Sequence, residues 1–209
     1  MGVELAHDYF MGIAMAVRKR ANCRGNRVGA IIVVEGRIVS TGYNGTPQDM
    51  PNCLDGGCDR CADRKKYRSG TAYDLCLCVH AEQNALLSAA RFGIAVQGGT
   101  VYSTMQPCFG CAKEMLQAKI KKVFYLHPWT YPDQAVHAEY EKVLARFPEG
   151  LHNLEVADPD AEWAISKVRE AETVPSGRCR RSLPVDSRAA TTGVTVPSFA
   201  TRSNVAMAS

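Results

Sequence analysis

The chain has 209 residues, of which 46% are hydrophobic and 22% are charged, as is usual for a globular protein. Its net charge is +4, but five of the 25 basic and two of the 21 acidic residues lie in 171–209, which leaves 20 and 19 in 1–170. A protein that grips a nucleic-acid backbone usually has a basic face, so this near-neutral part argues against a polynucleotide substrate. The sequence has no run of about 18 apolar residues and no signal-peptide pattern at its start, so we expect a cytoplasmic protein without a membrane segment.

The first part of the chain predicts a helix followed by a β-hairpin. Residues 4–21 place apolar side chains near helical spacing and end in three basic residues, where the helix dipole favours cations. Residues 28–34 are short, apolar and β-branched, as in a buried strand, and residues 37–43 return as a second strand after a Glu-Gly turn. The hairpin ends in a turn over residues 44–47.

Residues 48–79 form a long connection without periodicity, which in a compact domain is usually functional, disordered or clamped. It contains five of the nine cysteines, which are Cys53, Cys58, Cys61, Cys76 and Cys78. Because the chain shows no export signal, these cysteines favour metal or thiol chemistry over a disulfide framework. We therefore expect a cysteine-rich insertion loop that a metal clamps.

The remaining elements alternate between helix and strand. Helices are predicted from His80 to Phe92, from Pro107 to about Ala118, and over 133–146 and 160–171; strands are predicted over 99–104, 121–126 and 151–156. This order predicts an α/β fold of three layers, α/β/α, with a mixed central sheet of about five strands. We expect one domain over residues 1–174. Residues 175–209 lack periodicity and predict a disordered tail.

Two short motifs carry the chemistry. Residues 80–82 read H-x-E and residues 107–111 read P-C-x-x-C, which together are typical of zinc-dependent cytosine and adenine deaminases. A catalytic zinc needs three protein ligands and one open position, and His80, Cys108 and Cys111 would supply the three at two helix starts. The positive ends of those helices favour the thiolate forms that bind metal.

Glu82 lies two residues after His80, close enough to serve as a proton carrier without being a ligand. It would take a proton from the attacking water, deliver it to a ring nitrogen and later protonate the leaving ammonia. The competing interpretation is a structural zinc knuckle with three cysteines and one histidine. The presence of both motifs at predicted helix starts favours the catalytic zinc.

A second zinc, with a structural role, is expected in the loop. Its ligands would be Cys58, Cys61, Cys76 and Cys78, whose spacing is C-x₂-C-x₁₄-C-x-C. Alternatively, Cys53 takes the place of one of these four, or Cys78 only lies next to the catalytic site.

Two stretches of the sequence resemble the deoxycytidylate (dCMP) deaminase family of the cytidine and deoxycytidylate deaminase superfamily. They are Gly42-Tyr43-Asn44-Gly45-Thr46-Pro47 and Cys78-Val79-His80-Ala81-Glu82-Gln83-Asn84-Ala85, and the resemblance covers about residues 8–130. It implies the cytidine-deaminase-like fold, hydrolysis of dCMP to dUMP and ammonia, and supply of dUMP for thymidylate synthesis. Substrate contacts are implied for the turn residues Asn44 and Thr46 and for the backbone around Ala81.

The resemblance also implies partners, and it leaves alternatives open. Many members of the family form homo-oligomers, often hexamers, which dCTP activates and dTTP inhibits. One cation of residues 64–68 would meet the substrate phosphate, unless that stretch is simply a solvated loop. The alternatives are a zinc deaminase acting on another cytosine nucleoside or nucleotide, a different base or tRNA adenosine, and a zinc-stabilised binding protein without turnover.

Overall fold

The computed structural model describes residues 3–63, 65–67 and 71–164. The predicted tail over 175–209 and the end of the helix predicted over 160–171 lie outside the described residues, so the domain boundary at residue 174 stays a prediction. The helices are α1 (Val3–Arg18), α2 (Asp59–Ala62), α3 (Ala81–Arg91), α4 (Phe109–Gln117) and α5 (Gln134–Leu144). The strands are β1 (Gly29–Val34), β2 (Arg37–Tyr43), β3 (Thr100–Met105), β4 (Lys122–His127) and β5 (Leu151–Asn153).

The five strands form one mixed sheet in the order β2-β1-β3-β4-β5. β1 is antiparallel to both β2 and β3, whereas β3, β4 and β5 run parallel. The parallel pairs are joined by the helices α4 and α5, as parallel strands require. The predicted α/β class with a mixed five-stranded sheet is confirmed.

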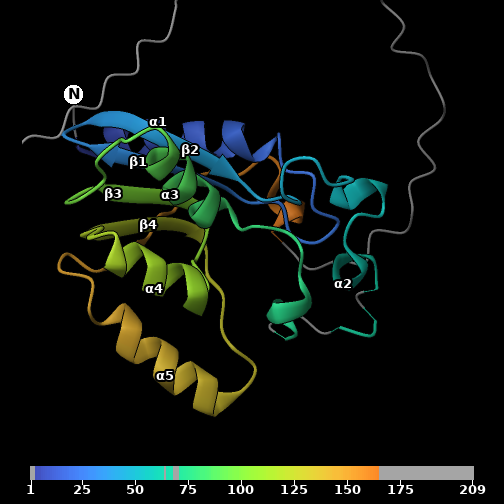
Figure 1. Ribbon diagram of the computed structural model, residues 1–209. Coiled ribbons are helices and arrows are strands. Elements are labelled where there is room, and N and C mark those ends of the chain that lie inside the picture. Colours follow the sequence, from blue (N-terminus) through green and yellow to red (C-terminus); the bar gives the residue numbers. More distant parts are fainter. Residues whose placement is uncertain (1–2, 64, 68–70, 165–209) are drawn as a thin grey trace, which may run out of the picture. The chain divides into compact units, whose positions relative to one another are not determined.

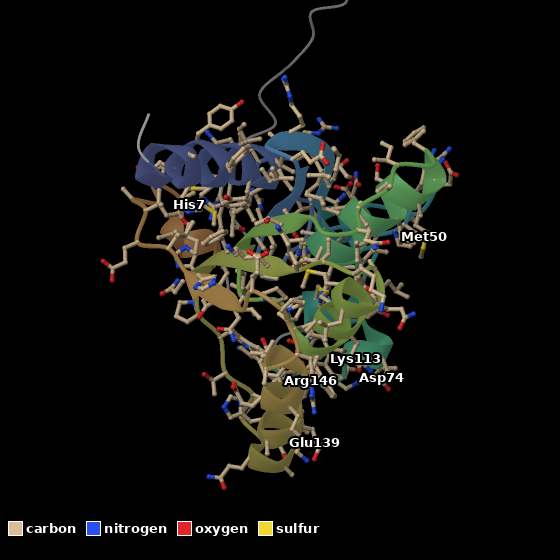
Figure 2. The ribbon with its side chains drawn as sticks, turned by 90° about the vertical axis from the view of Figure 1, so that its left-hand side faces the viewer. His7, Met50, Asp74, Lys113, Glu139 and Arg146 are labelled. Carbon is tan, nitrogen blue, oxygen red and sulfur yellow. The ribbon has the colours of Figure 1, made fainter. Side chains whose placement is uncertain are left out.

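Helices cover both faces of this sheet (Figure 1). On one face, Met11 and Ala14 of α1 pack with Ile31 of β1 and Tyr102 of β3. On the other face, residues of α3, α4 and α5 form a second buried cluster with Ile32 and other strand residues. Figure 2 shows His7 of α1 and Glu139 of α5 on opposite sides of the sheet. Because both faces are covered, β1 is a continuous apolar run, buried in five of its six residues.

Two glycines let helices approach the sheet closely. A Cβ added to Gly29 would lie 2.2 Å from the carbonyl oxygen of Ala14 in α1, and one added to Gly42 would lie 2.1 Å from that of Ala81 in α3. Any larger residue would have to displace the helix backbone. Gly42 therefore fixes how near the start of α3 comes to β2.

Several element boundaries differ from the prediction by one to three residues, and three differences bear on the site or on the edge of the sheet. The second predicted helix begins at Phe109, not at Pro107, because Cys108 has extended backbone angles and serves as the N-cap. The last strand ends at Asn153, and Leu154 and Val156 pack instead against the α1 face of the sheet. The loop predicted over 48–79 also contains α2 and short 3₁₀ turns at Cys53–Asp55 and Tyr73–Leu75. Within the described part of the chain, every helix is too short or too polar to cross a membrane.

Candidate active site

Three potential metal ligands meet where α3 and α4 begin. His80 is the N-cap residue of α3 and Cys108 that of α4, while Cys111 lies in the first turn of α4. The His80 Nδ1 atom lies 3.3 Å from the Cys108 Sγ and 3.4 Å from the Cys111 Sγ, and the two sulfurs are 3.5 Å apart. We call His80, Cys108 and Cys111 the three-donor site.

The spacing and chemistry of this set fit zinc. Ligands at about 2.0–2.3 Å from a tetrahedral zinc lie roughly 3.6–3.8 Å from one another, close to the three distances above. Nitrogen and sulfur are the donors that zinc prefers, and three of them leave a fourth position open. The predicted ligands are thus brought together by the fold, and each is placed by a helix start.

The local backbone holds both helix starts in place. Gly45 and Val79 exchange two backbone hydrogen bonds of 3.2 and 2.8 Å, which ties the turn after β2 to the residue before His80. The His80 amide donates to the Gln83 Oε1 at 3.0 Å, and the Gln83 Nε2 donates to the Glu114 Oε1 on α4 at 2.8 Å. Gln83 therefore both caps α3 and links it to α4.

Aromatic side chains hold the P-C-x-x-C turn from its other side. The Tyr140 hydroxyl donates to the carbonyl of Pro107, and the amide of Phe109 donates to the Tyr131 hydroxyl at 2.9 Å. The second bond satisfies an amide in the first turn of α4 that has no partner within the helix. Tyr140 is fully buried, so this support comes from the core under α5.

Glu82 lies beside the three-donor site and is buried, with 4% of its surface exposed. Its Oε1 accepts a hydrogen bond of 2.8 Å from the Ser103 hydroxyl of β3. Burial raises the pKa of Glu82, and the charge of His80 opposes that shift. The carboxyl group can therefore hold a proton at a higher pH than an exposed glutamate, which suits a group that both accepts and donates one.

The three donors themselves have shifted pKa values. The hydrogen bond between Cys108 and Cys111 lowers the pKa of Cys108 to about 4 and raises that of Cys111. Burial acts to lower the pKa of His80, but the hydrogen bond and charge of Cys108 outweigh it and raise the value to about 9. The lowered pKa favours the thiolate form of Cys108, which is the form that binds metal.

An open pocket leads to these groups. His80, Ala81, Glu82 and Cys108 form part of its wall, and Tyr73 and Trp129 supply aromatic surface. Among the described residues of the wall, Arg60 is the only arginine or lysine. Its guanidinium donates to the carbonyl of Thr71 and lies 4.9 Å from the centre of the Tyr73 ring.

Two of the three predicted substrate contacts line the pocket. Ala81 and Asn44 line the pocket, and Asn44 is buried. The Asn44 Oδ1 accepts from the Val28 amide and its Nδ2 donates to the Asn26 carbonyl, both at 2.8 Å, so one Nδ2 hydrogen remains beyond these bonds. Thr46 lies outside the pocket wall, and its hydroxyl donates to the Pro51 carbonyl at 2.9 Å.

The cysteines of the loop form a second group of potential ligands. Cys58, Cys61, Cys76 and Cys78, the four predicted for a structural zinc, have their sulfurs within 4.8 Å of one another. A second set of four overlaps it and is made of Cys23, Cys53, Cys61 and Cys78. We call these six residues the cysteine cluster.

Sequence reasoning missed four residues that the structure brings to these sites: Gln83, Ser103, Arg60 and Cys23. Gln83 was identifiable, because a glutamine at the third helical position often caps the residue before the helix. Ser103 lies on a predicted strand, and the alternation of side chains along a strand could have shown which face it occupies. No sequence signal indicates that its hydrogen-bond partner is Glu82. Arg60 and Cys23 reach their places through loop geometry, which leaves no sequence signal.

Comparisons with known proteins agree with this site. The profile described as "Cytidine and deoxycytidylate deaminase zinc-binding region" matches residues 5–127. Deoxycytidylate deaminase from Saccharomyces cerevisiae is 41% identical over 128 residues, which are 61% of this chain and 39% of the yeast protein. Deoxycytidylate deaminase from Mycobacterium phage D29 is 37% identical over 124 residues, 56% of this chain and 91% of the phage protein.

A solved structure is similar as well. The crystal structure of dCMP deaminase from the cyanophage S-TIM5, in complex with dCMP and dUMP, is 28% identical, with a TM-score of 0.55 over 74% of this chain and 99% of that one. The chain spans less than two-fifths of the length of the yeast relative but nearly all of the cyanophage protein.

Proposed function

The chain belongs to the cytidine and deoxycytidylate deaminase family, whose zinc-binding region matches residues 5–127, and from that premise we propose that it hydrolyses dCMP to dUMP and ammonia. The observation that carries the proposal is the convergence of His80, Cys108 and Cys111 beside the buried carboxyl group of Glu82. The relatives named deoxycytidylate deaminase support dCMP as the substrate. We propose that the product dUMP feeds thymidylate synthesis.

The reaction replaces the amino group at C4 of cytosine by a water oxygen. When bound to His80, Cys108 and Cys111, zinc would supply a water whose pKa falls from roughly 16 to about 7. Glu82 accepts a proton from the attacking water and delivers it to N3 of the ring. Glu82 then takes the remaining proton of the new C4 hydroxyl group and passes it to the departing amino group, so that ammonia leaves as the C4 carbonyl forms.

Other residues of the site bind and orient the substrate. Ser103 holds the Glu82 carboxyl group through its hydrogen bond to Oε1, which leaves the second oxygen for the proton transfers. The remaining Nδ2 hydrogen of Asn44 donates to the sugar or the base, and the backbone of Ala81 meets the pyrimidine edge. Thr46 contributes indirectly, by holding its turn against Pro51.

Arg60 is our candidate for the phosphate contact. The sequence pointed to residues 64–68, but the guanidinium of Arg60 is the one that faces the pocket among the described residues. An arginine can bind a phosphate through two parallel hydrogen bonds. Arg60 therefore distinguishes a nucleotide from a nucleoside in this proposal.

Ammonia release from dCMP, CMP, deoxycytidine, dCTP and guanine tests the substrate, with tRNA as a further arm. We expect dCMP to be the best substrate and Glu82→Gln to abolish turnover while zinc stays bound. Absence of dCMP turnover by the zinc-loaded protein would refute the proposal. Activity retained by Glu82→Gln would refute the mechanism even if the substrate were right.

We further propose a cytoplasmic homo-oligomer, a hexamer, activated by dCTP and inhibited by dTTP. The support is the family to which the chain belongs, together with the exposed apolar side chains of Leu87 and Phe92 on and beside α3, which suit a contact with a second copy. Light scattering and turnover with and without each nucleotide test both parts. A monomer that ignores both effectors would contradict them.

A further inference from the structure

In the described part of the chain, the residues around the cysteine cluster pack on sulfur atoms and not on an ordinary hydrophobic core. Their buried apolar cluster consists only of cysteines, namely Cys23, Cys53, Cys58, Cys61 and Cys78, with the half-buried Cys76 packed against it. Among the described residues between 48 and 79, the secondary structure is limited to helices and turns of three or four residues. Such a segment cannot bury enough carbon to fix its own shape, so something else must cross-link it.

The distances between the sulfurs indicate the kind of cross-link. Cys61 Sγ lies 3.6 Å from that of Cys23, 3.7 Å from that of Cys76 and 4.0 Å from that of Cys78. A disulfide bond would need about 2.05 Å. Four sulfurs bound to one zinc at about 2.3 Å lie roughly 3.8 Å apart, which is the spacing observed.

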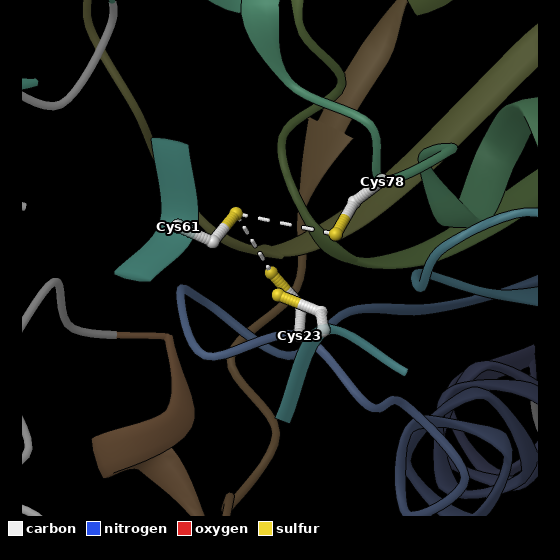
Figure 3. Close-up of side chains that lie close together, drawn as sticks. Cys23, Cys61 and Cys78 are labelled. Carbon is white, nitrogen blue, oxygen red and sulfur yellow. Dashed lines mark hydrogen bonds between the residues drawn. The ribbon is translucent and has the colours of Figure 1, made fainter. Parts of the chain in front are cut away.

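The six sulfurs divide into two sets of four that share Cys61 and Cys78. Cys23 and Cys53 complete one set, and Cys58 and Cys76 complete the other. Figure 3 shows the side chains of Cys23, Cys61 and Cys78 pointing toward one another, with the Cys61 sulfur in contact with the other two. Cys61 also contacts Cys76, so its sulfur lies between the two sets.

One zinc ion would use only four of these ligands and leave two further thiols packed against it. Two ions that share two ligands would use all six, each in a closed tetrahedral site. Two backbone amides already point at the first set: Gly25 donates to the Cys23 sulfur and Arg24 to the Cys53 sulfur, both at 3.3 Å. Amide donors of this kind stabilise the negative charge that thiolate ligands carry.

We propose that the cysteine cluster binds two zinc ions in one binuclear centre, in which Cys61 and Cys78 bridge the metals. Cys23 and Cys53 are the terminal ligands of one ion, and Cys58 and Cys76 those of the other. All six thiols release their protons on binding, so the centre carries a net charge of −2, which the Gly25 and Arg24 amides partly offset. This centre is structural and does not depend on the proposed deamination.

The first test is the zinc content of the full chain, purified under reducing conditions and measured by native mass spectrometry and elemental analysis. We expect three zinc ions per chain, two in the cluster and one in the three-donor site. His80→Ala should reduce the count to two without disturbing the cluster. A total of two in the unaltered chain, or iron in place of zinc, would overturn the proposal.

Serine variants of the terminal ligands provide a matched pair. Cys58→Ser and Cys23→Ser should each lower the zinc content, because each removes a ligand from a different ion. A single zinc on either set of four would leave one of the two variants with the zinc content of the unaltered chain, and that outcome would overturn the binuclear centre.

Cadmium-113 NMR of the unaltered chain decides the question even if the variants do not fold. We expect two resonances from cadmium bound by four sulfurs, with coupling between them through the bridging thiolates, and a third from the site with nitrogen and two sulfurs. A single four-sulfur resonance would refute the binuclear centre.

Discussion

The three-donor site and the cysteine cluster use the same kinds of ligand on different kinds of backbone. His80, Cys108 and Cys111 lie at the starts of two regular helices that pack on the sheet. The six cysteines of the cluster come from the segment after α1 and from the irregular residues 48–79. The hydrophobic core of the domain positions the three-donor site, whereas the cysteine cluster is itself the buried core of its own segment.

This difference separates a site suited to reaction from one suited to structure. Three donors leave an open position beside the carboxyl group of Glu82, which we propose as the proton carrier. Sets of four sulfurs close the metal off from water. We infer that the geometry of the three-donor site persists without metal, while the cluster segment depends on it.

Metal removal should give the largest effect. It tests directly whether the cluster segment depends on metal while the sheet that carries the three-donor site does not. After chelation under reducing conditions, trypsin should cut at Arg60, Lys65 and Lys66 at least about tenfold faster. The reason is that the free energy of metal binding stabilises the folded form of such a segment. Lys122 in β4 should stay protected, and mass spectrometry of the fragments measures both. Equal acceleration at Lys122 would show that the sheet depends on metal as much as the cluster does.

Much of the sheet and of the three-donor site could be predicted from sequence, because their signals are local. The β-branched run of β1 and the two motifs at helix starts each lie within a few residues of chain. Cys53 was considered only as a replacement for one of the four predicted ligands, and Cys23 was missed, because loops of no regular geometry bring these two residues together. Arg60 was missed for the same reason, and the contact with the substrate phosphate was predicted within the basic stretch 64–68 instead.

Ser103→Ala should have the second-largest effect, and it tests how strand β3 supports Glu82 beside the three-donor site. It removes the hydrogen bond to the Glu82 Oε1 and should lower kcat by roughly 10–100-fold, since a bond to a charged group contributes about 1.5–3 kcal/mol. Zinc content and the KM for dCMP should change little. Steady-state kinetics measure the split, and Ser88→Ala on the outer part of α3 is a control with the same chemical change. An unaltered kcat would show that Glu82 is held by other contacts.

Arg60→Gln tests whether the cluster region also takes part in substrate binding. If Arg60 meets the phosphate, the KM for dCMP should rise roughly tenfold, with turnover of deoxycytidine unchanged. Arg24→Gln is a matched control, because Arg24 also donates to a loop carbonyl, that of Leu54, but lies outside the pocket wall. Equal losses with dCMP and deoxycytidine would assign Arg60 a structural role only.

Gln83→Ala should have the smallest effect and asks how far the three-donor site depends on hydrogen bonds between its helices. The variant removes the cap on the His80 amide and the link to Glu114, so we expect a loss of about 1–2 kcal/mol in the free energy of unfolding. Denaturant unfolding measures it, with Gln117→Ala, exposed near the end of α4, as the control.

The zinc affinity of Gln83→Ala shows whether the core or the Gln83 side chain brings the two helix starts together. Packing of α3 and α4 on the sheet survives in Gln83→Ala, and Gln83 bonds the backbone amide of His80, not its ring. Competition with a chelator should therefore show an affinity for the three-donor site only a few-fold weaker than in the unaltered chain, less than the roughly 10–100-fold typical when a partner of a metal-ligand side chain is lost. A loss of more than about 100-fold would mean that this side-chain link, and not the core, brings the two helix starts together. The three-donor site would then depend on a few polar contacts, and its contrast with the cysteine cluster would be one of degree.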